Sequence, residues 1–572
     1  MTTNETADSG PWLDRLFEAY YMRRPVNATF VGVRGHDHRL PDVSPEGVAG
    51  TASEMETLLA EAPVGMPTHP IRDLGQLDRR LAEGFLRIQL WEHESGWQLG
   101  NPSAHTGEAV FGLMSLLLPG SAPVEGQAEA LIGRMEGLDA FFTDSRAHLR
   151  EAPTSWTERA LRECRGGLAF LRDGLPRAEV SGAGSEAFRA AVTRATEAFE
   201  RYSGFLESEL MHRPSDRIAC GADAFDLHLR EGHFLDRGAD EIAAYAREEI
   251  ASAKAWLAEA AAEHGGATPS DVLARLADAH PSADGYVARY EEVWRDMKEV
   301  SEQRDLVSWP DFPIRYAPRP IWSREAAPEL YFLFYRSPAA FGRPPVHDYM
   351  IAPLEAGMSS AEQDSFLRSN NDSVIKLNHV VHHGGIGHHV QNWNAFRSPL
   401  RIGRMAAVDC SSRIAMFCGG TMAEGWACYA TDLMAEAGGL TPLEVFAEHS
   451  GRVRMAARAV VDVELHHGRM TLDEAAHYYV DTAGMSEAAG RAEAVKNSMF
   501  PGAALMYLVG TDMIHELRAD LMRILGDRFV LRDFHDAFLS YGSIPVKIVA
   551  DEMRSRATLG LPLNAHASLG AS

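Results

Sequence analysis

The sequence has few cysteines, and none of them are paired in a metal-binding spacing. Its 572 residues include five cysteines, and no C-x-x-C pair occurs among Cys164, Cys220, Cys410, Cys418 and Cys428. An odd, scattered set argues against a disulfide framework and against a zinc site of the cysteine type. We therefore expect a protein of a reducing cytoplasm, in which these thiols stay reduced.

Long apolar runs and an excess of positive charge are also missing. The longest apolar stretch, Val110 to Leu118, is far shorter than the ~18 residues that a transmembrane helix needs. The first residues, Met1 to Thr6, lack the basic and apolar regions of a signal peptide. Lys and Arg total 55 against 80 Asp and Glu, which gives a net charge of −25. This balance argues against nucleic-acid and anionic-membrane partners.

What is present is an ordinary globular composition with strong helix signals. Apolar residues make up 45% and charged residues 24%, and the length allows several domain-sized units. From Asp240 to His264, apolar residues recur with the period of one helix face. Thr441-Pro442-Leu443-Glu444 and Thr471-Leu472-Asp473-Glu474 have the pattern of helix-capping boxes. The sequence therefore predicts a mainly α protein.

Strand patterns are few, and prolines gather in one region. The best strand candidates are 312–316, 330–335 and 347–351, and the proline-rich stretch 308–345 separates two helix-rich parts. We expect an N-terminal helical lobe, 10–307, and a C-terminal helical lobe, 308–562, that carries the functional site. The expected architecture is a large two-lobed helical fold with a small β element and a central cleft.

The most informative segment is a histidine cluster. Five of the 24 histidines fall within 379–389, where even scattering would place about half a histidine. Neutral imidazole is the commonest metal ligand. His382 and His388 are too far apart on a regular helix to share one ion, because six residues rise ~9 Å. Glycines at 384, 385 and 387 disfavour a continuous helix. We expect a helix that ends near His383, a bend, and a return that brings His388 to the site.

The segment from His382 to Gln391 resembles the H-E-x-x-P-G-H-H-x-Q motif of the bacterial domain-of-unknown-function family 885. That family has a mostly helical fold similar to the carboxypeptidase Taq family and is usually taken to be zinc-peptidase-like. Further matches are spread over most of the chain: Pro25-x-x-Ala28-Thr29-x-x-Gly32, Leu40-x-Asp42-x-Ser44, Ala423-Glu424-Gly425-Trp426-Ala427-x-Tyr429, Arg458-x-x-x-Asp462-x-x-x-His466, Pro501-Gly502-x-Ala504-x-x-Tyr507-x-x-Gly510 and Phe534-His535-Asp536-x-x-Leu539-x-x-Gly542-x-x-Pro545.

The resemblance implies a metal centre. His382 and His388 would be ligands, with His389 as a competitor for the second place, and Glu424 would be the carboxylate ligand. Tyr507 would stabilise an oxyanion. The resemblance also suggests three residues that would lie beside the metal ligands or contact the substrate: His466, Asp462 and His535.

The sequence departs from the motif at its second position, where His383 replaces the glutamate. In zinc peptidases of this kind that glutamate is the general base, and losing a positioned base typically costs ~10²–10⁴-fold in rate. Ile386 also replaces the motif proline. His383 takes over as catalytic base in one interpretation, and becomes a ligand or substrate contact in a second. In a third, the site is a relic and the protein only binds a ligand or partner.

These interpretations predict different chemistry. The first gives a metal-dependent hydrolase of amide or peptide-like bonds with one divalent ion, zinc before other metals, acting on a small molecule or short peptide-like substrate. The second gives a non-hydrolytic metalloenzyme, such as an oxygenase, lyase or isomerase, with iron or another transition metal. The third predicts no metal.

Overall fold

The computed structural model describes residues 10–62, 67–118, 125–330, 340–407 and 412–565. Contacts divide the chain into two units, of which the first comprises 1–217, 319–334 and 338–344 and the second comprises 218–318, 335–337 and 345–572. The expected division at residue 307 differs from this one, because residues 218–307 pack with the second unit.

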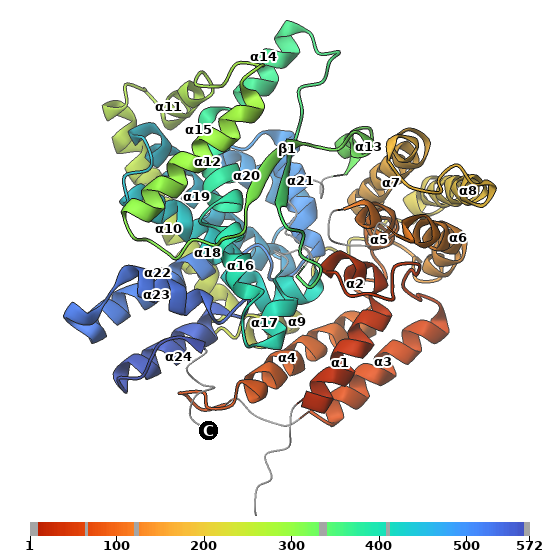
Figure 1. Cartoon of the computed structure of the whole chain (residues 1–572), viewed down its shortest axis with the longest axis horizontal. Coiled ribbons are helices and arrows are strands. Elements are labelled where there is room, and N and C mark those ends of the chain that lie inside the picture. Colours follow the sequence, from red (N-terminus) through yellow and green to blue (C-terminus); the bar gives the residue numbers. More distant parts are fainter. Residues whose placement is uncertain (1–9, 63–66, 119–124, 331–339, 408–411, 566–572) are drawn as a thin grey trace, which may run out of the picture. The chain divides into compact units, whose positions relative to one another are not determined.

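The first unit is a helical bundle (Figure 1). Its core is formed by apolar side chains from α5, α6, α7 and α8, including Leu113, Leu138 and Phe199. Its α-helices are α1 Gly10–Arg23, α2 Pro25–Val31, α3 Pro45–Ala60, α4 Leu74–Glu94, α5 Pro102–Met114, α6 Gln127–Arg146, α7 Thr154–Ala169, α8 Glu186–Ser208 and α13 Ile321–Arg324. Shorter helical turns are η1 Ser115–Leu117, η2 Phe170–Gly174, η3 Leu175–Arg177, η4 Leu210–His212 and η6 Ala327–Glu329.

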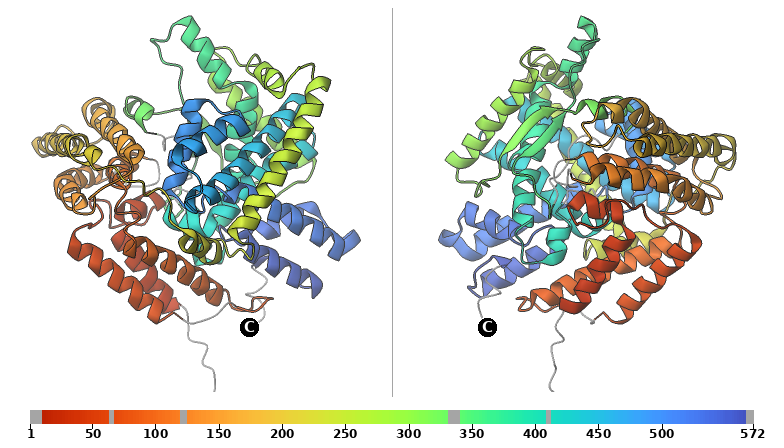
Figure 2. Two further views of the ribbon diagram at one scale, coloured as in Figure 1. Left: turned by 180° about the vertical axis from the view of Figure 1, so that it is seen from behind. Right: turned by 45° about the vertical axis from the view of Figure 1, so that its right-hand side comes forward.

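The second unit is also mainly helical (Figure 2). Its α-helices are α9 Ala222–Leu227, α10 Ala239–Glu263, α11 Pro269–Leu276, α12 Tyr286–Gln303, α14 Ser360–Ser369, α15 Asp372–Val374, α16 His388–Ala395, α17 Arg401–Met405, α18 Arg413–Glu436, α19 Pro442–His466, α20 Leu472–Ala483, α21 Glu487–Met499, α22 Met506–Leu525, α23 Leu531–Leu539 and α24 Val546–Thr558. It also holds η5 His228–Gly232, η7 Ile375–Gly384 and η8 Gly526–Arg528, of which η5 and η7 are π-helical.

A two-stranded parallel sheet is the β element of the described chain. β1, Ile314–Pro318, pairs with β2, His347–Ile351, with Ile314 opposite His347 and Tyr316 opposite Tyr349. The expected strands at 312–316 and 347–351 correspond to these two, and the expected strand at 330–335 falls mostly outside the described residues. The mainly α fold with a small β element is confirmed.

The capping patterns begin the helices that they predicted. The Thr441 side chain accepts a hydrogen bond from the Glu444 amide at the start of α19, and Thr471 does the same with Glu474 at the start of α20. The apolar stripe of 240–264 becomes α10, which buries Ile242, Ala246 and Leu257 against α19. None of the described helices has the length and apolar composition that a bilayer span requires.

Candidate metal centre

The chain breaks between His383 and His388, as the glycines predicted. The π-helix η7 ends at Gly384, and α16 begins at His388. A Cβ atom on Gly387 would lie 1.9 Å from the carbonyl oxygen of His382, so only glycine fits where the chain turns back on itself. The bend therefore depends on glycine at this position.

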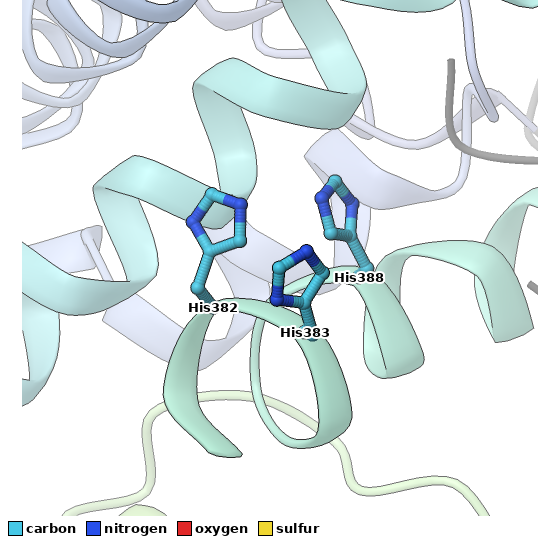
Figure 3. A group of neighbouring side chains, drawn as sticks. All are labelled: His382, His383 and His388. Atoms are coloured by element: carbon cyan, nitrogen blue, oxygen red, sulfur yellow. The ribbon is translucent and has the colours of Figure 1, made fainter. Parts of the chain in front are cut away.

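The bend gathers three imidazole rings (Figure 3). Ring centroids lie 4.9 Å apart for His382 and His388, 4.6 Å for His382 and His383, and 5.3 Å for His383 and His388. One ring nitrogen from each residue lies within 4.8 Å of the other two. All three side chains rise on the same side of the turn between η7 and α16.

Helix α18 brings a carboxylate to the same place. Oε2 of Glu424 lies 3.3 Å from Nε2 of His382 and 3.6 Å from Nε2 of His388. Two ligands bound tetrahedrally to zinc at ~2.0–2.1 Å lie roughly 3.3–3.4 Å apart. The distances from this carboxylate oxygen to the two imidazole nitrogens are therefore close to those around a shared divalent ion.

The protonation states also suit a metal. Burial alone would raise the pKa of the Glu424 carboxyl, but the nearby rings of His382 and His388 hold that pKa well below its usual range. Burial lowers the pKa of His382, and it lowers that of His383 further, with added repulsion from the neighbouring histidines. An ionised carboxylate beside neutral imidazoles is the state that binds metal.

His383 has a fixed ring orientation. Its Nδ1 lies 2.7 Å from the carbonyl oxygen of Asn378, five residues earlier in the π-helix. A carbonyl only accepts hydrogen bonds, so Nδ1 carries the proton of the neutral ring and Nε2 carries the lone pair. This tautomer leaves Nε2 able to bind a metal or to accept a proton.

Two tryptophans and two glycines position the carboxylate relative to the histidines. The indole of Trp426 donates to the Ile386 carbonyl at 2.8 Å, and that of Trp294 donates to the Gly384 carbonyl at 3.0 Å. A Cβ on Gly425 would lie 2.6 Å from the backbone of Gly510, so α18 and α22 approach closely beside Glu424. Three helices thus hold the glycine turn and the carboxylate together.

The candidate centre forms one wall of a cavity of about 570 Å³. His382, His383 and Glu424 line it together with Tyr507 and Arg458. The Arg458 guanidinium lies 4.5 Å from the centre of the Tyr507 ring. All lining residues belong to the second unit, and they come from both sides of residue 307, with Leu273 and Leu276 before it and the others after it.

Other residues that the resemblance suggested lie elsewhere. His389 points to a different neighbourhood, where its Nε2 bonds the Phe312 carbonyl at 2.9 Å and its ring stacks on that phenyl group. His466 is fully buried and bonds the Asn497 carbonyl. His535 is held between the Leu306 carbonyl and the Tyr429 hydroxyl. The structure does not bring these three histidines to the cavity.

Asp462 has a backbone role. Its carboxylate accepts hydrogen bonds from the amides of Gly502, Ala504 and Leu505, which organises the turn before α22. This turn precedes Tyr507 directly, so Asp462 acts on the cavity through the backbone.

Sequence reasoning missed several residues that line the cavity. These are Cys428, Thr431, Glu448 and Arg454. Cys428 follows Glu424 by one helical turn, and Arg454 precedes Arg458 by one turn, so the spacing of four residues was the available signal. Glu448 had no signal in the sequence, because only the packing of α19 against the cavity selects it.

The family profile described as "bacterial protein of unknown function (DUF885)" matches residues 25–553. The chain belongs to this family. No curated protein matches this member of DUF885.

Two solved structures share the fold of this DUF885 protein. One, from Shewanella oneidensis, is described as "a putative lipoprotein of unknown function", and the other, from Colwellia psychrerythraea, as a "putative lipoprotein". The first has a TM-score of 0.74 at 20% identity and covers 96% of this chain and 100% of its own. The second has a TM-score of 0.72 at 17% identity, with 96% and 98% coverage. At these identities the likeness shows the fold.

Proposed function

We propose that this protein is a metal-dependent hydrolase of amide or peptide-like bonds, related to the helical zinc peptidases. His382, His388 and Glu424 would hold one divalent ion, with zinc as the first choice. The observation that carries the proposal is the convergence of their ligand atoms, with Oε2 of Glu424 3.3 Å from Nε2 of His382 and 3.6 Å from Nε2 of His388, beside a substrate-sized cavity that His382 and Glu424 line.

The bound ion would supply Lewis acidity and lower the pKa of a water molecule towards ~7. His383 would act as the base that accepts the proton of that water on Nε2. The Asn378 carbonyl supports this role, because it fixes the proton of the neutral ring on Nδ1 and would stabilise the imidazolium that forms. His383 would thereby replace the glutamate that the family motif has at this position.

Tyr507 would stabilise the negative charge that develops during hydrolysis, and Arg458 would position Tyr507. Both residues line the cavity, and the guanidinium packs over the phenol ring. A phenol hydroxyl is a hydrogen-bond donor of the kind that stabilises an oxyanion. Arg458 is held by an ion pair with Glu493 at 2.8 Å, so it would position Tyr507.

One observation favours a second function. His383 belongs to the same group of ring nitrogens as His382 and His388, within 4.8 Å. Three histidines and one carboxylate that all bind the ion would leave no general base at this position. Such a donor set suits iron and other redox metals, and it would give a non-hydrolytic metalloenzyme.

Metal content tests the proposal. The wild type, His382→Ala and Glu424→Ala would be purified without affinity tag, reloaded with zinc, iron, manganese or copper in turn, and measured by elemental analysis. His477→Ala is the matched control, because His477 is an exposed histidine on α20. We expect about one zinc per chain in the wild type and control, and none in the two site variants.

The reloaded proteins would then be screened against peptide and N-acyl amide substrates by mass spectrometry. Zinc-dependent cleavage that both site variants lack would support the hydrolase. Tight iron binding with no cleavage would favour the second function. Failure to bind any metal would contradict both and leave a binding protein.

A further inference from the structure

Three arginines on α19 differ in whether they have a partner. Arg452 forms ion pairs with Glu249 and Asp512, at 2.7 and 2.6 Å, and Arg458 pairs with Glu493. Arg454 forms no hydrogen bond or ion pair with any other described residue. The N–H groups of the Arg454 guanidinium can therefore donate hydrogen bonds to a ligand.

Arg454 lines the same cavity as the candidate metal centre and is exposed to solvent there. The side chain is exposed, but the cavity wall around the guanidinium removes part of its hydration, and this desolvation, followed by repulsion from Arg458, lowers its pKa. An anion bound at Arg454 would offset both effects. An unpaired guanidinium in a cavity is a common means of recognising a negatively charged ligand group.

The position of Arg454 relative to the metal follows from the facing helix. Arg454 lines one cavity together with Cys428, which stands one turn after Glu424 on α18. One turn corresponds to roughly 6 Å along the helix axis. A group held at Arg454 would therefore belong to the same small molecule as a group held at the metal.

The surroundings of Arg454 favour a carboxylate over a phosphate. Glu448 also lines the cavity and interacts electrostatically with Arg454. Burial raises the pKa of Glu448 to about 7, so this carboxyl group is partly ionised near neutral pH. The carboxyl groups of Glu448 and Glu424 in this cavity would repel a dianionic phosphate more strongly than a carboxylate, which carries one charge and matches the planar fork of a single guanidinium.

We infer that Arg454 is the specificity residue of this site and binds a free carboxylate group of the substrate. This inference rests on the proposed hydrolase. It restricts the substrates to amides that carry a carboxylate beside the bond to be cleaved, as in N-acyl amino acids. The two groups come from different α-helices: α18 provides the metal ligand Glu424, and α19 provides the anion-binding Arg454.

Measurements of ligand binding test this inference independently of any catalytic activity. The probes are N-benzoylglycine, its neutral amide N-benzoylglycinamide, and inorganic phosphate, measured by isothermal titration calorimetry. The proteins are the wild type, Arg454→Gln and Arg454→Lys, each also in the His382→Ala background, where metal would be lost. Arg295→Gln is the matched control, because Arg295 is an exposed arginine on α12 that does not line the cavity.

We expect N-benzoylglycine to bind at least ~10-fold more tightly than its amide to the wild type, the control and His382→Ala. Arg454→Gln should abolish that preference, and Arg454→Lys should retain part of it. Circular dichroism would verify that each variant is folded, and the lysine variant provides the test if Arg454→Gln does not fold.

Three results would overturn the inference: equal binding of acid and amide, a preference that survives in Arg454→Gln, and tighter binding of phosphate than of N-benzoylglycine. A preference that disappears in His382→Ala would assign the carboxylate to the metal and would also overturn it. If the preference persists while no zinc-dependent cleavage is found, the proposed hydrolase fails and the carboxylate site stands.

Discussion

The indole nitrogen of Trp426 lies 2.8 Å from the carbonyl oxygen of Ile386, and this hydrogen bond joins two parts of the candidate metal centre. Trp426 is two residues from Glu424 on α18, and Ile386 is two residues from His388 in the glycine turn. The bond therefore fixes the carboxylate relative to a histidine that is far away in the sequence.

Replacing Trp426 by phenylalanine removes this hydrogen bond and keeps an aromatic ring. We expect Trp426→Phe to bind zinc ~10–100-fold more weakly, as is typical when a group that orients a metal ligand is lost. Competition with a zinc-binding dye gives the affinity. Trp256→Phe, at a partly exposed tryptophan on α10, is the control, and an unchanged affinity in Trp426→Phe would contradict the prediction.

Adding one methyl group to the turn should disrupt the site. In Gly387→Ala the new Cβ would meet the His382 carbonyl at 1.9 Å, so the backbone must shift. We expect zinc binding to be lost and the free energy of unfolding to fall by at least about 2 kcal/mol. Urea denaturation measures the second effect.

Gly451→Ala is the matched control for that substitution. Gly451 lies within α19, and a Cβ there would meet nothing within 4 Å. Alanine should raise the free energy of unfolding by up to ~1 kcal/mol, because it favours a helix interior more than glycine does. Similar losses of stability in both variants would contradict the steric explanation.

His383 decides between the two proposed chemistries. If it acts as base, His383→Ala keeps about one zinc per chain and loses ~10²–10⁴-fold in hydrolysis. His383→Glu, which restores the family motif at this position, should then recover activity. Loss of the metal itself in His383→Ala would identify His383 as a ligand and favour the non-hydrolytic metalloenzyme.

Stability should fall in mild acid because of buried histidines outside the site, of which His228 and His233 are two examples. His228 and His233 are almost fully buried, and burial lowers the pKa of each to about 4. Unfolded histidine titrates near ~6.5, so between pH 6.5 and 4 the unfolded chain binds protons that the folded chain does not. Folding is favoured fully above this range, and each histidine removes about 1 kcal/mol of stability at pH 5.5 relative to pH 7.5.

Urea denaturation at the two pH values tests this expectation. His233→Gln should reduce the acid-dependent loss by about 1 kcal/mol, because one of the buried neutral histidines is gone. The exposed His477→Gln should leave the loss unchanged. An equal pH dependence in wild type and His233→Gln would contradict the assignment.

Local signals predicted much of the fold. The capping boxes at Thr441 and Thr471 and the stripe of 240–264 act within one or two helical turns, and all three produced the expected helices. The glycine break after His383 is equally local, and it predicted the return of His388 to the cluster.

The choice among neighbouring residues could not be read from the sequence. His388 and His389 are adjacent, so their side chains point about 100° apart, and only the packing of His389 against Phe312 decides which one joins the candidate metal centre. Arg454 likewise looks like any other helix arginine in the sequence. Its lack of a partner depends on carboxylates placed by distant segments, which pair with Arg452 and Arg458 instead.

The contact of Gly425 with Gly510 restricts how this family member can change. A Cβ on either glycine would fall on backbone atoms of the other helix, at 2.6 Å from Gly510 and 2.3 Å from Thr421 respectively. No rotation of a neighbouring side chain relieves such a clash, so a second substitution nearby cannot compensate for the first. Two residues without functional groups therefore impose a purely geometric condition on every sequence that keeps Glu424 in place.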